Sequence, residues 1–175
     1  MLYFNAQKQK KYYQVIFLLF SVTVVSGCGF TPIYKNNADY SIQEQLNVIT
    51  IDPISGLPGL HLRNHLISRI HPKGTTDSPL YKLSVQLTSS VEPLLIQLDN
   101  TATRKNIKIV AKFLLTDLSQ NNVIFGNSVS SVGSFNVVES DFATITAEKN
   151  TMKRVSKEIA NKIFDSLVIY FVAKT

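Results

Sequence analysis

His61 and His65 have the spacing that comes closest to that of a chemical site. Residues four apart lie on one face of a helix, so two imidazoles at this spacing can bind one metal ion. The stretch reads H-L-R-N-H, however, and lacks the glutamate that zinc hydrolases use as a general base. His71, the third histidine, lies beyond the end of the helix that we expect here. We therefore expect no metal site.

Other residue patterns that support catalysis are missing from the sequence. It contains no Gly-rich phosphate loop, no G-x-S-x-G motif and no paired carboxylates on one element. Cys28 is the single cysteine, which excludes an intrachain disulfide and a zinc cluster built from cysteines. A hydrolase would need a nucleophile and a base that we do not find. We expect a protein that is not an enzyme and needs no cofactor.

Residues 1–27 have the pattern of a secretory signal peptide. Three lysines and no acidic residue precede a mostly apolar stretch at residues 12–25, which small residues follow. This stretch is shorter than the roughly 18–20 apolar residues that a helix needs to cross a bilayer. A signal peptide is therefore expected rather than a membrane span.

The end of this segment, Val25-Ser26-Gly27-Cys28, resembles the lipobox of bacterial lipoproteins. The resemblance implies that the Cys28 thiol receives a diacylglycerol, that the chain is cut before it, and that the new amino group is acylated. Two or more acyl chains hold a protein durably on a membrane. Gly29 stands where an Asp would resemble an inner-membrane retention signal, so the outer membrane is favoured. The alternatives are an ordinary signal peptide or a core helix with a buried cysteine.

The charge of the remaining chain argues against nucleic-acid binding. Of the formal net charge of +6, three positive charges lie before Cys28, which leaves about +3 for the rest. A dedicated nucleic-acid binder needs clustered cations to neutralise several phosphates. We expect residues 28–45 to be a lipidated N-terminus and polar tether, and residues 46–175 to be one globular domain.

The domain begins with a strand and a helix in our interpretation. Residues 46–51 read as a strand that ends at Asp52-Pro53, and Pro58-Gly59 marks a turn. From Leu60 to Ile70 the apolar residues recur every three or four positions, which predicts a short amphipathic helix.

Alternating apolar and polar residues predict three more strands, at 81–88, 104–115 and 123–138. The apolar side of the middle strand consists of Ile107, Ile109, Ala111, Phe113 and Leu115. Asn121-Asn122 suits a hairpin turn that tolerates positive φ. The last strand has Val123, Phe125, Val129, Phe135 and Val137 on one side. Its serines and Gly133 make the middle of this strand thin, which indicates a bulge or a closely approaching partner.

A long helix is predicted from Ser140-Asp141 toward Phe171, with a charged face that we expect to be solvated. These elements predict an α+β fold: a two-layer sandwich in which two helices pack on one face of a mostly antiparallel four-stranded sheet.

The start of the mature chain, Cys28-Gly29-Phe30-Thr31-Pro32-Ile33-Tyr34, resembles the LPS-assembly lipoprotein LptE family in its alphaproteobacterial form. Residues 135–136 and 141–148, with Arg154 and Ile159-Ala160, are similar to the family's S-Y-N…Y-A…A-E…R…L-A ending. Phe135 stands where tyrosine is usual. The resemblance implies a lipoprotein that plugs the outer-membrane β-barrel LptD from within its lumen, assists its assembly and helps deliver lipopolysaccharide to the outer leaflet.

A cationic strand face is the expected lipopolysaccharide contact, since this ligand carries phosphates and acidic sugars. Arg104, Lys108 and Lys112 share one face of a strand at intervals of about 13 Å, and Lys82 lies on a neighbouring strand. Alternatively these charges only solubilise the domain or face the barrel. A scaffolding envelope lipoprotein without lipopolysaccharide contact would share the lipobox and the amphipathic elements.

Overall fold

The computed structural model describes residues 37–74, 77–96 and 102–174, all within the compact unit Asn37–Thr175. Its elements follow the order α2 (Asn37–Asn47), β1 (Ile49–Ile51), α3 (Gly56–Ile70), β2 (Tyr81–Ile96), β3 (Ala102–Asp117), β4 (Asn122–Asn136) and α4 (Asp141–Lys174). The strands form one sheet in the order β1-β2-β3-β4. β1 is parallel to β2, and the other pairs are antiparallel. The predicted α+β class and mostly antiparallel four-stranded sheet are confirmed.

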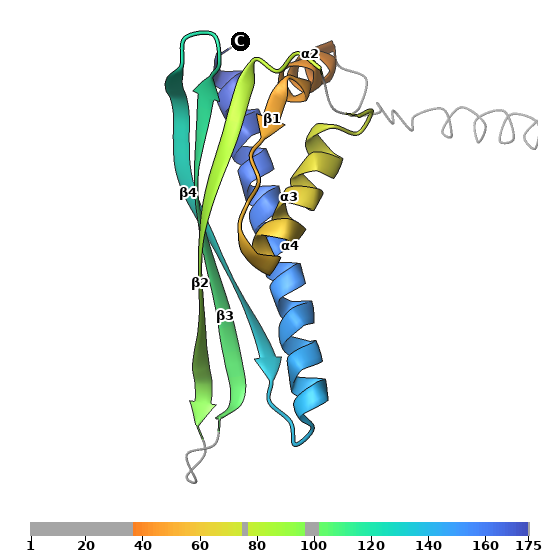
Figure 1. The fold of residues 1–175 in the computed structure, drawn as a ribbon, viewed down its shortest axis with the longest axis vertical. Coiled ribbons are helices and arrows are strands. Elements are labelled where there is room, and N and C mark those ends of the chain that lie inside the picture. The colour runs from red at the N-terminus through yellow and green to blue at the C-terminus, as the bar shows by residue number, and fades with distance from the viewer. Residues whose placement is uncertain (1–36, 75–76, 97–101, 175) are drawn as a thin grey trace, which may run out of the picture. The chain divides into compact units, whose positions relative to one another are not determined.

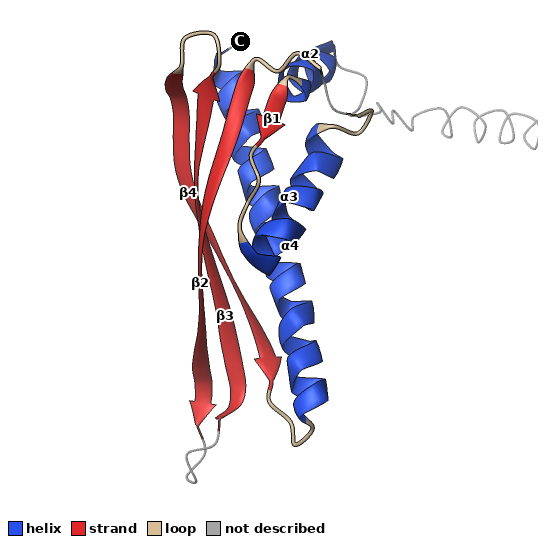
Figure 2. Cartoon of the chain, in the orientation of Figure 1, coloured by secondary structure: helices blue, strands red, loops and turns tan. Residues whose placement is uncertain are grey.

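The helices lie on one side of the sheet, and within residues 37–174 no described element covers its other face, here called the open face (Figures 1 and 2). α4 packs on β3 and β4, and α3 packs beside α4 and β1. The core between the layers contains the predicted stripe of β3, in which Ile107, Ile109, Ala111 and Leu115 are fully buried and Phe113 nearly so. Val155, Ile159, Ile163 and Leu167 face it from α4. Alternation with period 2 on the strand and period 3.6 on the helix predicted this interface.

The prediction of a polar tether before the domain is wrong from Asn37 onward, because these residues form the helix α2. Leu46 is buried in the core, and the Gln43 side chain donates a hydrogen bond of 2.9 Å to the carbonyl of Ile70. The described part of the chain therefore has three helices rather than the two predicted. β1 is correspondingly shorter than the predicted strand at 46–51, since Leu46 and Asn47 belong to the last turn of α2.

The helix α3 begins four residues earlier than predicted, so Pro58 and Gly59 lie in its first turn rather than in a turn before it. Proline is tolerated there because the first amides of a helix have no intrahelical partner. A Cβ on Gly59 would lie 2.6 Å from the carbonyl oxygen of Ile54, so glycine allows the helix to approach the segment after β1. The helix ends at Ile70 before Pro72, as expected.

The turn between β3 and β4 follows the sequence prediction, but the first residue of β4 does not. Asn121 has a positive φ of 51°, as the Asn-Asn pair indicated. Val123 is 56% exposed, although we expected it on the buried side. Thr116 pairs with Val123 whereas Leu115 pairs with Phe125, so β4 holds one additional residue at this bulge. A bulge reverses the face on which the residues before it lie.

Candidate functional site

The open face of the sheet is the surface on which the predicted ligand-binding cations lie. Along the central strand β3, odd-numbered residues from 107 to 115 are buried against the helices, and the even-numbered residues point to the other face. Arg104, Lys108 and Lys112 are all exposed on this open face. The structure therefore brings the three cations together in one row, here called the β3 cation row.

Polar side chains of both neighbouring strands flank the β3 cation row. Lys108 pairs with Ser90 on β2, and Lys112 pairs with Gln86 on β2 and Ser128 on β4. Arg104 pairs with Asn136 on β4. Side chains directly opposite each other in a sheet lie close enough to bind one ligand together. A hydroxyl or amide side chain thus lies opposite each cation on at least one neighbouring strand.

Lys82, the fourth predicted residue, lies on the same face of β2 and pairs with Thr116. It is half-buried and lies four residue pairs beyond the Gln86–Lys112 pair, so it adds a cation past the end of the β3 cation row. Glu92 pairs with Asn106, between Arg104 and Lys108, and adds a carboxylate to the face. Asp52 Oδ2 accepts a hydrogen bond of 2.7 Å from Ser84 Oγ, two residues from Lys82, so a second carboxylate lies at that end of the face. The positive charge is therefore concentrated at Lys108 and Lys112.

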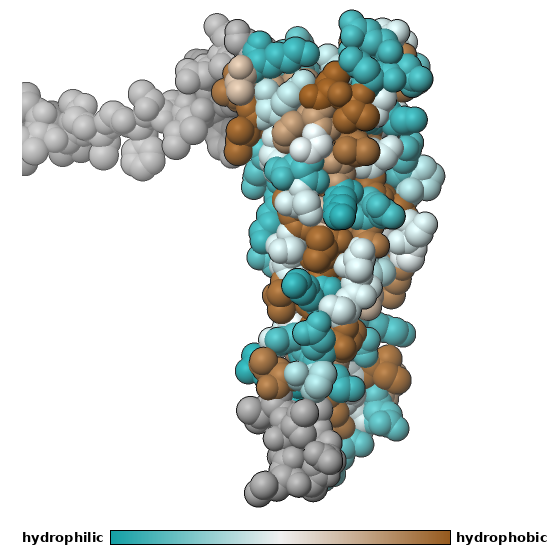
Figure 3. All heavy atoms as spheres, turned by 90° about the vertical axis from the view of Figure 1, so that its left-hand side faces the viewer, coloured by the Kyte–Doolittle hydropathy of each residue, from teal (hydrophilic) through white to brown (hydrophobic). Residues whose placement is uncertain are grey.

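The open face also carries isolated apolar side chains. Leu114 is 48% exposed and Val132 54% exposed, and Val132 pairs directly with Lys108. Figure 3 shows brown apolar residues interspersed with teal polar ones on this side of the molecule. A surface of this mixed type can bind a ligand that combines sugars, anionic groups and short apolar segments, or pack against a polar protein wall.

Close packing of α4 supports the open face from behind. A Cβ on Gly133 of β4 would lie 2.5 Å from Val155 Cγ2 and 2.8 Å from Thr151 Cγ2. The small residues in the middle of β4 were predicted to indicate either a bulge or a closely approaching partner. The close approach of α4 at Gly133 confirms the second. Two hydrogen bonds join the same elements: Ser131 Oγ donates to Glu158 Oε2 at 2.6 Å, and Lys162 Nζ donates to the Ser130 carbonyl at 2.7 Å.

The predicted histidine pair lies on α3, in the helical layer, on the other side of the sheet from the open face (Figure 1). His65 Nε2 is 2.9 Å from Asn161 Oδ1 on α4. Arg69 donates to the same oxygen at 2.8 Å, which fixes the amide orientation and makes His65 Nε2 the donor. His71 is buried separately, and its burial lowers its pKa below the ordinary value of 6.5. Over the described residues, no group of three or more His, Cys, Asp or Glu side chains is arranged to hold a metal ion.

Two sequence predictions concern membranes. Cys28, the predicted lipidation site, lies outside the described residues, so its lipidation stays a prediction. Among the helices of the described segments, none combines the length and the apolar character that crossing a bilayer requires.

Sequence reasoning missed one polar site, a groove between α3 and α4. It brings the histidine pair next to Lys153 and Lys157 of the predicted charged helix face. Both pairs have i, i+4 spacing and were visible in the sequence, but nothing there indicated that the two faces meet.

Comparisons with known proteins support the fold. The sequence matches no protein-family model. It is 23% identical over 159 residues to the uncharacterized protein RP188 of Rickettsia prowazekii, covering 91% of this chain and 98% of that protein.

Among solved structures, a candidate lipoprotein from Caulobacter crescentus superposes with a TM-score of 0.63 at 21% identity, over 77% of this chain and 98% of that one. Rare lipoprotein B from Shewanella oneidensis superposes with a TM-score of 0.56 at 10% identity, over 71% of this chain and 96% of that one. A minor lipoprotein from Acinetobacter baumannii superposes with a TM-score of 0.54 at 15% identity, over 70% of this chain and 90% of that one. The chain described here therefore has the fold found in these lipoprotein structures.

Proposed function

We propose that this chain is an envelope lipoprotein of the LptE type, attached to the outer membrane through acylated Cys28. It sits in the lumen of the LptD β-barrel on the periplasmic side, plugs and helps assemble that barrel, and assists delivery of lipopolysaccharide to the outer leaflet. The sequence C-G-F-T-P-I-Y after the lipobox and the fold shared with solved lipoprotein structures support this proposal.

The observation that carries the proposal is the polar, cation-bearing open face of the sheet. A sheet with helices on both faces would bury its residues on both sides. Here the helices lie on one face (Figure 1), and Lys108, Lys112 and Leu114 of β3 are exposed on the other. The lumen of a large outer-membrane barrel is polar and wet, so a protein seated in it needs polar surface on many sides. Serine, threonine, glutamine and lysine side chains give the open face that character.

The β3 cation row is the proposed contact for lipopolysaccharide. Phosphate groups and acidic sugars form charge-assisted hydrogen bonds with Arg and Lys, and these bonds are stronger than neutral ones. The flanking Ser90, Gln86 and Ser128 can bind sugar hydroxyls beside Lys108 and Lys112. Lys82 continues the row on β2. This role requires binding and release only, so the protein is proposed to be non-catalytic.

Charge reversal at two positions tests the site. The double variant Arg104→Glu with Lys108→Glu is expected to weaken lipopolysaccharide binding at least about tenfold, because two attractive contacts become repulsive. Both side chains are exposed, so the thermal unfolding midpoint should stay close to that of the parent. The matched control is Lys149→Glu with Lys174→Glu, which makes the same charge change on exposed positions of α4. Equal binding by the double variant and the parent would remove this assignment.

A further inference from the structure

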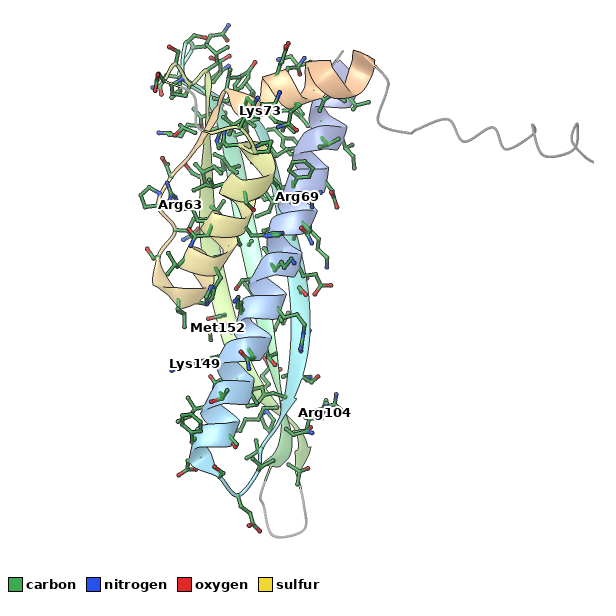
Figure 4. The ribbon with its side chains drawn as sticks, turned by 90° about the vertical axis from the view of Figure 1, so that its right-hand side faces the viewer. Arg63, Arg69, Lys73, Arg104, Lys149 and Met152 are labelled. Carbon is green, nitrogen blue, oxygen red and sulfur yellow. The ribbon has the colours of Figure 1, made fainter. Side chains whose placement is uncertain are left out.

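A groove between the two packed helices α3 and α4 is lined entirely by polar side chains. Its volume is about 370 Å³, and its lining residues are His61, Asn64, His65 and Ser68 of α3 with Lys153 and Lys157 of α4. The α3 residues are spaced at i, i+3, i+4 and i+7, so they form one continuous face of that helix. Figure 4 shows α3 lying alongside α4 on this side of the domain.

The α4 wall of the groove is positively charged, and no acidic residue lines the groove to balance this charge. Lys153 and Lys157 are exposed and lie one helical turn apart, where like charges repel each other. None of the six lining residues is acidic. Among the described residues, neither lysine nor the side chains of His61 and Asn64 have a hydrogen-bond partner. An anion between the helices would relieve the repulsion and accept hydrogen bonds from these groups.

Contacts at the edge of the groove hold its two walls in place. Asn161 of α4 accepts hydrogen bonds from His65 and Arg69 of α3, at 2.9 and 2.8 Å. The Arg69 guanidinium also stacks 4.0 Å above the ring of Phe164. The Ser68 hydroxyl donates to the His65 carbonyl, so Ser68 contributes shape rather than a donor. A site whose walls are fixed beforehand loses little entropy when a ligand binds.

We propose that this groove binds a phosphate monoester group. Such a group carries about 1.5 to 2 negative charges at neutral pH, which matches the two ammonium groups of one wall. Its oxygens point in tetrahedral directions and can accept hydrogen bonds from several sides. The groove offers donors on both walls, Lys153 and Lys157 on α4 and His61 and Asn64 on α3. A carboxylate is planar and singly charged, so it reaches fewer of these donors. This site is separate from the β3 cation row, which lies on the opposite layer.

The phosphate group could belong to a free, water-soluble phosphate compound or to the headgroup of a lipid, and two probes distinguish these sources. The full chain, purified from membranes in nonionic detergent, is titrated with inorganic phosphate and, separately, with monomeric dihexanoyl phosphatidic acid. The side-chain NMR signals of His61 and His65 report on the groove. We expect saturable shifts of these signals with at least one probe and none with chloride at equal ionic strength. Shifts with both probes assign the phosphate group itself, and shifts with the lipid probe alone assign the headgroup.

Variants of the α4 wall decide whether the lysines carry the binding. Lys153→Gln with Lys157→Gln is expected to raise the dissociation constant at least tenfold, and Lys153→Arg with Lys157→Arg to stay within about threefold of the parent. Lys149→Gln with Lys174→Gln removes the same charge from α4 outside the groove and should bind as the parent does. Absence of shifts with either probe, or equal binding by the Lys153 and Lys157 glutamine variant, would overturn the proposal. Neither result bears on lipopolysaccharide binding by the β3 cation row.

Discussion

Gly133 is the residue on which the packing of α4 against β4 depends most directly. The nearest atoms to an added Cβ are side-chain methyls of Val155 and Thr151 on the facing helix, both within 2.8 Å. Since both residues are buried, they cannot move away without shifting the helix. We expect Gly133→Ala to lower the free energy of unfolding by about 1–3 kcal/mol, as overpacking of a core usually does.

A second glycine of the same strand is the matched control. A Cβ on Gly126 would meet the end of the Leu114 side chain at 2.9 Å, and this leucine is 48% exposed and can rotate away. Gly126→Ala should therefore change the free energy of unfolding by less than about 0.5 kcal/mol. Denaturant unfolding of both variants measures the difference, and equal losses would contradict the proposed close approach of α4.

His71 makes stability depend on pH. Burial lowers its pKa below 6.5, so the unfolded chain binds a proton at this residue more readily than the folded chain does. The contribution to stability is fully present above pH 6.5 and is lost as the pH falls through the lower pKa of the folded state. We expect the free energy of unfolding of the parent to fall more steeply between pH 7.5 and 5 than that of His71→Asn. Parallel curves for the two proteins would contradict this account of His71.

At the scale of elements, an aromatic cluster fixes the C-terminal end of α4 on the sheet. Phe125 of β4 stacks on Tyr170 with ring centroids 4.7 Å apart, and Phe171 lies 5.7 Å from Tyr81 of β2. Phe171 is 2% exposed, whereas its neighbour Val172 is 53% exposed. Phe171→Ala should cost about 3–5 kcal/mol of unfolding free energy, and Val172→Ala less than about 0.5 kcal/mol. Thermal or denaturant unfolding measures both, and a small loss in Phe171→Ala would show that this end of α4 is held elsewhere.

Elements with a strong period were predictable from the sequence, and those without one were not. The alternation at 104–115 identified β3 and its buried side, and the spacing from Val155 to Leu167 identified α4. α2 was missed because most of its residues are polar and Ile42 and Leu46 are its only large aliphatic residues. Its contact with α3 stabilises the helix in the folded domain. Val123 was misplaced because a bulge has no reliable sequence signal.

The candidate site was likewise predictable where it depends on strand periodicity and not where it depends on how the helices pack. Strand periodicity alone placed Arg104, Lys108 and Lys112 on one exposed face, as the structure confirms. The groove between α3 and α4 was not predictable, since each helix shows its own spacing but not the face that it presents to the other. Contacts between residues distant in sequence, such as His65 with Asn161, depend on how the helices pack.

At the scale of the whole molecule, the proposed function depends on lipid attachment at Cys28. Two or more acyl chains bind durably to a membrane, and the proposed acylation of Cys28 supplies them. We expect metabolic labelling with palmitate to mark the parent and to be absent from Cys28→Ala, which should persist as an unprocessed precursor. A labelled Cys28→Ala variant would contradict the lipidation site.

Co-purification tests whether the domain resides inside an outer-membrane barrel, as we propose. The tagged full chain is extracted from outer membranes in mild detergent, captured, and its partners are identified by mass spectrometry. We predict that an LptD-type β-barrel of far larger mass is recovered in stoichiometric amount. Recovery of peptidoglycan, or of no partner, would contradict the plug function and favour a scaffolding lipoprotein.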